Sequence, residues 1–217
     1  MKILPLARKA IRFELGLWKS LFRWALRRTA LTDPTAVGFS YAGVVTPMFI
    51  GITVVAAIEI PVAHLLLPWA PVRLVLLLLG VQTLFWMIGL LASLRVNPHE
   101  VSDSGLRIRY GTGLDFTIAW QDIAAIRPRI RALHSNRTVV HEETEAGLVL
   151  SVGVASQTNL DVVLRRALTV DLRGETSEPF SQLRFYTDES AALVARAREL
   201  IACYAVPDGT APAATSG

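Results

Sequence analysis

Residue types that carry out catalysis or bind metals are sparse in this chain of 217 residues. The four histidines are scattered, at positions His64, His99, His134 and His141. His134 and His141 lie near Glu142 and Glu143, where a solvated loop is favoured over a metal site. The sequence contains no P-loop, no GxGxxG turn after a strand, no HExxH and no GxSxG. With a single cysteine, Cys203, it has no internal disulfide. We therefore predict no enzymatic activity, no cofactor and no metal.

The strongest binding signal is a set of arginines in the second half of the chain. They are Arg107, Arg109, Arg127, Arg129 and Arg131. Each alternates with apolar residues, so on a strand it lies opposite the apolar face. If adjacent strands align these arginines, they form a basic patch for lipid headgroups or an acidic partner. The alternative is a solvated face balanced by nearby acids, and it is favoured because acids slightly outnumber bases after residue 33.

Two apolar segments predict a transmembrane hairpin. The chain is 52% hydrophobic and 18% charged, whereas soluble domains carry about 25% charged residues. Residues 44–67 and 74–94 are each long enough to cross a hydrocarbon core of about 30 Å. Eight basic residues precede the pair and Arg95 follows it, while the link carries only Arg73. The positive-inside rule then predicts a multi-pass plasma-membrane protein with both termini cytoplasmic. A buried hairpin of a soluble protein is the disfavoured alternative.

Polar residues inside these segments need partners or a function. They are Glu59, Pro61, His64, Gln82 and Thr83. An acid at the centre of a span costs about 2.5–3.5 kcal/mol on insertion scales. Glu59 and Gln82 lie equally far from the link, so we predict that Glu59 donates to Gln82 or Thr83 across the hairpin. That bond would hold the two helices together, or it would form a site for a proton or ligand. The third possibility is that the Glu59 side chain snorkels outward to the membrane surface. Pro61 predicts a kink, and His64 lies near the outer headgroups.

The first 33 residues predict a basic amphipathic helix. On a helical wheel its basic residues share one side: Lys2, Arg8, Lys9, Arg12, Lys19, Arg23 and Arg27. Trp, Phe and Leu cover the opposite side, a pattern typical of a helix lying among anionic headgroups. A mitochondrial presequence and a helix packed on another protein domain are the alternatives. Since no basic and aromatic array occurs elsewhere, no nucleic-acid partner is expected.

Residues 96–204 predict a β domain. About seven short strands of alternating polarity precede an amphipathic helix over 189–204, with Asp188 as its N-cap. The polar stretch 132–147 is typical of a loop, with one short strand expected at 138–141. We expect a cytoplasmic all-β barrel or sandwich capped by this helix. Residues 205–217 are rich in Ala, Pro, Gly and Thr and predict a disordered tail.

Residues 102–126, SDSGLRIRYGTGLDFTIAWQDIAAI, resemble the opening of bacterial pleckstrin-homology-like (PH-like) domains fused to membrane hairpins. The pattern is a strand, a Gly turn, a second strand ending in Trp120, and then Asp122-Ile123. The hairpin of residues 34–95 also fits, so the resemblance covers residues 34–204. It implies a seven-stranded PH-like barrel with a C-terminal helix, no enzymatic activity, and a role in assembly or membrane-associated binding.

Two functions follow from these patterns. The first is a non-catalytic interaction or scaffold protein anchored in the bilayer, whose PH-like domain binds a protein partner or lipid headgroups at the inner leaflet. The second is a small transport- or sensing-related subunit in which Glu59 and Gln82 bind a proton or ligand. Two spans cannot enclose a pathway alone, so the second function needs a homo-oligomer or a protein partner.

Overall fold

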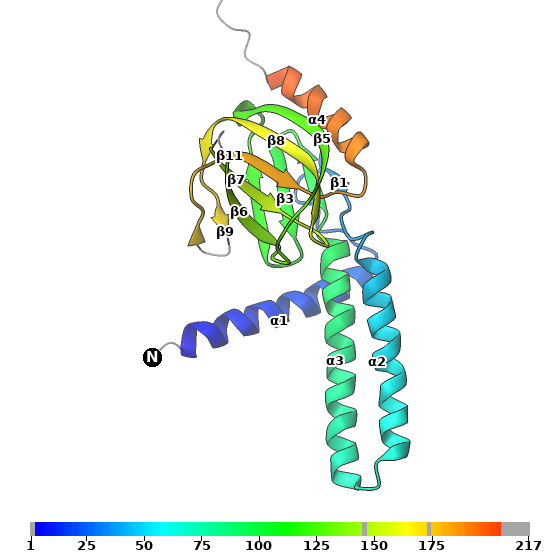
Figure 1. The fold of residues 1–217 in the computed structure, drawn as a ribbon. Helices are drawn as coiled ribbons and strands as arrows, with labels where there is room; N and C mark the ends of the chain where they lie inside the picture. Colours follow the sequence, from blue (N-terminus) through cyan, green and yellow to red (C-terminus); the bar gives the residue numbers. More distant parts are fainter. Residues whose placement is uncertain (1–2, 145–146, 173–174, 205–217) are drawn as a thin grey trace, which may run out of the picture.

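The computed structural model describes residues 3–144, 147–172 and 175–204, with side chains of the first helix described at Ile11 and from Phe13 onward. The predicted tail and Lys2 therefore lie outside the described residues, as do the side chains of Arg8, Lys9 and Arg12. Three helices and a β domain make up the described chain (Figure 1). The helix expected in the N-terminal segment is α1 (Ile3–Ala25), and it crosses α3 beneath the β domain (Figure 1).

The hairpin consists of α2 (Thr46–Leu66) and α3 (Ala70–Val96). Both helices are long and apolar enough to cross a membrane, and at most 6% of their most apolar windows is buried, unlike a soluble core helix. The link is shorter than the six residues expected, because α3 takes up Pro71 in its first turn, where the missing N–H has no helical acceptor. Helix α2 continues through Pro61.

The two helices meet along a seam with a seven-residue repeat. On α2 the half-buried positions are Thr46, Phe49, Thr53, Ala56, Ile60 and Ala63. On α3 the seam consists of the half-buried residues Arg73, Leu77, Gly80, Leu84, Met87 and Leu91, while Ile88 and Leu90 are also half-buried but lie outside the repeat. Alternating steps of four and three are typical of coiled-coil packing. The helices approach closely at Gly80, where an added Cβ would lie 2.8 Å from Ile60 Cγ1.

The β domain contains two sheets. Sheet A is antiparallel, in the order β1 (Val37–Phe39), β2 (His99–Ser102), β3 (Gly105–Tyr110), β4 (Leu114–Ile118). Sheet B has the order β5 (Ile123–Ala132), β8 (Gln157–Leu168), β11 (Phe180–Phe185), β7 (Gly147–Val152), β6 (Val139–Thr144). A small hairpin joins β9 (Asp171–Leu172) and β10 (Glu175–Thr176). A 3-10 turn (Trp120–Asp122) links the sheets, and α4 (Ser190–Tyr204) follows β11.

One hydrophobic core joins both sheets and α4. It includes Ile108 and Ile118 of sheet A, Leu150 and Leu183 of sheet B, and Leu193 of α4. The alternation of polar and apolar residues explains the β3–β4 hairpin, in which Leu106 pairs with Ile118 across the Gly111–Gly113 turn. A β domain closed by a C-terminal helix is therefore confirmed.

Several details of the β domain differ from the sequence-based expectation. The short strand expected in the polar stretch before Gly147 is the six-residue strand β6, and β8 runs unbroken over twelve residues. Strand β11 runs parallel to β7, so sheet B is not a simple antiparallel meander. Asp188 is not the N-cap of α4: its carboxylate accepts hydrogen bonds from Ser40 Oγ (2.7 Å) and from the Gly43 N–H (2.9 Å). It thereby attaches the start of the hairpin to the domain.

Candidate functional site at the base of the β domain

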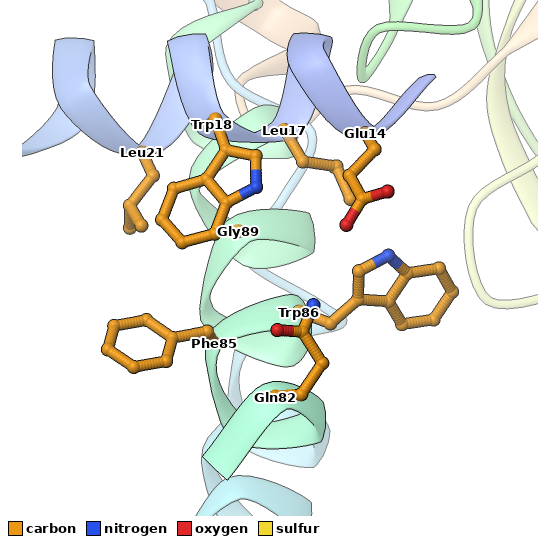
Figure 2. A pocket seen from close by; sticks show the side chains of 8 residues that line it. All are labelled: Glu14, Leu17, Trp18, Leu21, Gln82, Phe85, Trp86 and Gly89. Atoms are coloured by element: carbon orange, nitrogen blue, oxygen red, sulfur yellow. The ribbon is translucent and has the colours of Figure 1, made fainter. Parts of the chain in front are cut away.

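Helix α1 packs across α3 through an aromatic and glycine contact (Figure 2). Leu17 is buried against Gly89, where an added Cβ would lie 3.5 Å from Leu17 Cβ. On either side of this contact, the rings of Phe13 and Trp86 are 6.2 Å apart and those of Trp18 and Phe85 are 6.0 Å apart. Because glycine leaves a gap on α3, the α1 backbone can approach closely. Gly89 therefore determines where α1 crosses α3.

The upper side of α1 touches the β domain. An added Cβ at Gly16 would lie 3.2 Å from Thr112 Cβ, in the turn between β3 and β4. One turn along α1, Ser20 is also buried. Helix α1 is therefore held between α3 and the Gly111–Gly113 turn.

The two remaining sides of α1 are exposed and differ in chemistry. At about 100° per residue, Ile11, Leu15 and Phe22 lie opposite Gly16 and Ser20, facing away from the β domain. All three are exposed, Leu15 and Phe22 by 63% and 68%. The exposed Lys19 and the half-buried Arg23 lie on the side away from α3. Helix α1 thus has the domain above it, an apolar surface below, α3 on one flank and cations on the other.

Beyond α1, Ala30 and Thr32 of the linker between α1 and β1 are attached to sheet A. Arg109 Nη1 donates to the Ala30 carbonyl (2.6 Å), and Arg109 Nη2 donates to Thr32 Oγ1 (2.6 Å). The Thr32 N–H donates to Glu100 Oε1 (3.2 Å). The Ala30 N–H donates to the carbonyl of Val96, the last residue of α3 (2.9 Å). The linker is therefore bonded to α3 through the Ala30 N–H and to sheet A through Arg109 and Glu100.

Arg109 is paired with a buried acid. Its side chain and that of Glu100 are 6% and 2% exposed, and they form an ion pair with a charge-assisted hydrogen bond. Arg107 lies one pleat away and forms a bidentate pair with the exposed Asp115, at 2.5 and 2.7 Å. Both arginines therefore support the linker and the β3–β4 hairpin.

The structure divides the five predicted patch arginines between two sheets. Arg107 and Arg109 lie on β3, whereas Arg127, Arg129 and Arg131 lie on β5, which pairs with β8 and not with β3. Arg131 pairs with Asp161 at 3.3 Å. Only Arg127 and Arg129 are exposed without an ion pair to a carboxylate of the described chain. Adjacent strands therefore do not align the set into one patch.

His99 occupies a buried polar position that the sequence did not distinguish from the other histidines. Its Nδ1 accepts from the Arg109 N–H (3.2 Å), so the proton is on Nε2, which donates to the Tyr186 carbonyl (3.0 Å). Burial lowers the pKa of His99 to about 4, and its ring contacts Tyr41 and Phe185. The Tyr41 hydroxyl accepts from the Gly111 N–H (2.7 Å), and burial raises its pKa above the usual range. Both rings stiffen the base of the domain.

The polar residues of the hairpin do not form the predicted bond. Glu59 is exposed, about 100° around α2 from Ile60 on the seam. Gln82 lies about 200° from Gly80 on α3, and it lines a small gap with Glu14 of α1 (Figure 2). Thr83 Oγ1 donates to the Leu79 carbonyl of its own helix (2.8 Å). Glu59 and Gln82 lie at the same depth in the hairpin, but a bond between them also requires that their side chains face each other. They do not, because they lie on different sides of their helices.

Replacement of Glu59 by leucine is expected to favour insertion of α2. The exposed carboxylate has no partner in the described hairpin, so its removal should lower the insertion free energy by about 2.5–3.5 kcal/mol. The fraction of α2 inserted in a microsomal insertion assay measures this, with Ile58→Leu as the matched exposed control. Reduced insertion of Glu59→Leu would show that Glu59 makes a specific bond.

The remaining predicted chemistry is dispersed. His64 is exposed in the last turn of α2, His134 and His141 are exposed on the β domain, and Cys203 is exposed near the end of α4. In the described ranges, no group of three or more His, Cys, Asp or Glu side chains is placed to hold a metal ion.

A polar cleft opens beside α1, between its C-terminal end and sheet A. Its volume is about 610 Å³, and Arg23, Arg28 and Thr29 line one side while Arg109 and Asp115 line the other. The sequence pattern identified Arg23 as part of a basic helix face but not Arg28, which follows the end of α1. No signal within the helix pattern brings these residues to Arg109, which lies about 80 positions further along the chain.

Neither a known family model, nor a curated protein, nor a solved structure matches this chain.

Proposed function

We propose that the protein is a non-catalytic, membrane-anchored interaction or scaffold protein whose β domain is held in a fixed orientation at the inner leaflet. In this proposal α2 and α3 cross the plasma membrane and both termini are cytoplasmic. The supporting observation is the position of α1 between α3 and the Gly111–Gly113 turn. Its exposed apolar side faces away from the β domain, as an in-plane helix at a bilayer surface requires.

A fixed orientation distinguishes this anchor from a flexible tether. The linker is bonded to Arg109 and Glu100, and Asp188 bonds Ser40 and Gly43 before α2. The β domain is therefore bonded at two places to the chain that precedes α2, and at the other end of the hairpin α3 runs directly into β2. Such an attachment supports a domain that presents one surface to a protein partner or to lipid headgroups.

The alternative function is a transport or sensing subunit, and the positions of Glu59 and Gln82 do not favour it. It requires Glu59 and Gln82 to act together, and they face different directions on the hairpin. The Glu59→Gln variant tests this alternative. Loss of a pH-dependent phenotype in a variant that still folds would support a transport or sensing function.

Replacement of Gly89 by leucine is expected to displace α1. A leucine side chain would occupy the position of Leu17, so the crossing would be lost. Cysteines at Gly16 and Thr112 in a Cys203→Ser background should form a disulfide before this change, because their Cβ atoms would lie 3.2 Å apart and a shift of a few tenths of an ångström brings them into the disulfide range of about 3.5–4.5 Å. The yield of that disulfide should fall severalfold in Gly89→Leu. Gly51→Leu is the control, since an added Cβ at Gly51 meets nothing within 4 Å; equal loss in both variants would contradict the packing argument.

The membrane orientation has a direct test. Single cysteines replace Ala70, the first residue of α3, and Ser135 in the β domain, again with Cys203→Ser, and an impermeant thiol reagent is added to intact cells. We expect labelling at position 70 and none at 135, and crosslinking in parallel should identify the partner. Labelling at position 135 would place the β domain outside and overturn the proposal.

A further inference from the structure

We infer that the cleft between α1 and sheet A binds the phosphodiester headgroup of an anionic phospholipid through Arg23 and Arg28. This inference rests on the proposed function, because it requires α1 to lie at a bilayer surface. It adds a specific site and ligand class to the general expectation of an interaction domain.

The first argument is the unused positive charge of the cleft. Arg109 is committed to Glu100, Ala30 and Thr32, and Asp115 is committed to Arg107. Arg23 is half-buried and Arg28 is exposed, and neither forms an ion pair with a carboxylate of the described chain. Two guanidinium groups therefore face the cleft with their donors available, which suits bidentate binding of phosphate oxygens.

The second argument is the way the chain brings these two arginines together. The Arg28 N–H donates to the Arg23 carbonyl (2.9 Å) and the Arg27 N–H donates to the Trp24 carbonyl (2.9 Å). This is a Schellman motif, in which glycine usually occupies the left-handed position. Here Arg27 occupies it with φ of 53°, an unfavourable conformation for a side chain with a Cβ. The strained turn fixes Arg28 beside Arg23, and it directs the linker toward sheet A.

The third argument is the level of the cleft. It adjoins the last turn of α1, whose exposed apolar side chains, such as Phe22, point away from the β domain. A helix with that side in the acyl region places its upper flank among the headgroups. A volume of about 610 Å³ accommodates a phosphodiester with a small polar headgroup. A protein ligand is disfavoured because the cleft lies between α1 and the domain base, at the bilayer surface.

The test uses the full chain in nanodiscs of neutral phosphatidylcholine. Short-chain phosphatidylglycerol, short-chain phosphatidylcholine and sn-glycerol 3-phosphate are added separately, and binding is measured by native mass spectrometry. We expect phosphatidylglycerol to bind at least about tenfold more tightly than the other two ligands. The Arg23→Gln/Arg28→Gln variant should lose that preference, and each single variant should lose part of it.

The matched control is Arg27→Asn, which removes the same charge from a neighbouring position outside the cleft lining and suits the left-handed conformation. It should retain the preference. Equal loss in Arg27→Asn and in the double variant would overturn the site in favour of diffuse electrostatics. Equal affinity for sn-glycerol 3-phosphate would overturn the lipid assignment in favour of a soluble phosphate. Intact binding with inverted cysteine labelling would overturn the proposed orientation and leave the cleft assignment standing.

Discussion

Replacement of Arg109 by methionine is expected to lower the free energy of unfolding by about 3–5 kcal/mol, the range for a buried ion pair that loses one member. Methionine fills a similar volume but leaves Glu100, whose side chain is 2% exposed, without its counter-charge. It also removes the bonds to the Ala30 carbonyl and Thr32 Oγ1, so the linker should detach from sheet A. Denaturant unfolding in detergent micelles, followed through near-ultraviolet circular dichroism, measures the change.

The neighbouring arginine is the control for this experiment. The side chains of Arg107 and Asp115 are 25% and 48% exposed, so Arg107→Met should cost only about 0.2–1 kcal/mol. Equal losses in the two variants would contradict the importance of burial. The double variant Arg109→Met/Glu100→Leu should recover much of the stability, because it removes the uncompensated charge as well.

Acidification is expected to destabilise the folded protein through His99. The pKa of His99 is lowered to about 4 by burial, while the unfolded chain has an ordinary histidine pKa of about 6.5. Above pH 6.5 neither state binds the proton, and His99 contributes no pH dependence. Between pH 6.5 and 4 the unfolded state binds it and the folded state does not. The free energy of unfolding should therefore fall by about 3 kcal/mol across this window.

The measurement compares unfolding of the full chain at pH 7, 6, 5 and 4 with that of two variants. His99→Gln should lower stability at pH 7, because it perturbs the bonds to Arg109 and Tyr186, but it should remove most of the slope between pH 6.5 and 5. His141→Gln changes an exposed histidine and should preserve the slope. A slope unchanged in His99→Gln would assign the titration to other groups.

Local patterns predicted the elements of this fold. The segments 44–67 and 74–94 correspond to α2 and α3, because length and apolarity are properties of each helix alone. The alternation around Gly111–Gly113 predicted the β3–β4 hairpin for the same reason. The pattern predicts the strand β6 only as a short piece at 138–141, since an edge strand with both faces partly exposed lacks an apolar alternation.

Relations between distant residues were not accessible from those patterns. The parallel pairing of β7 with β11 depends on the order of strands in space, which no turn signal encodes. The alternation of the strand predicts that Arg109 is exposed, whereas in the fold it is bonded to Glu100, Ala30 and Thr32. The directions of Glu59 and Gln82, by contrast, follow from a local pattern. The repeat through Ile60 and Gly80 identifies the facing sides of α2 and α3, and neither polar residue belongs to it.

The pairing of β1 with β2 has a consequence for how many times the chain can cross a bilayer. Val37 pairs with Val101 and Phe39 with His99, although the whole hairpin lies between them in the sequence. The hairpin is thus an insertion within sheet A, and its two ends meet in adjacent strands. A bilayer crossed by α2 must be crossed back by α3, so the number of crossings is even whatever the distribution of flanking charges. Closure of sheet A is accordingly compatible with insertion of both helices or of neither, and it excludes insertion of one helix alone.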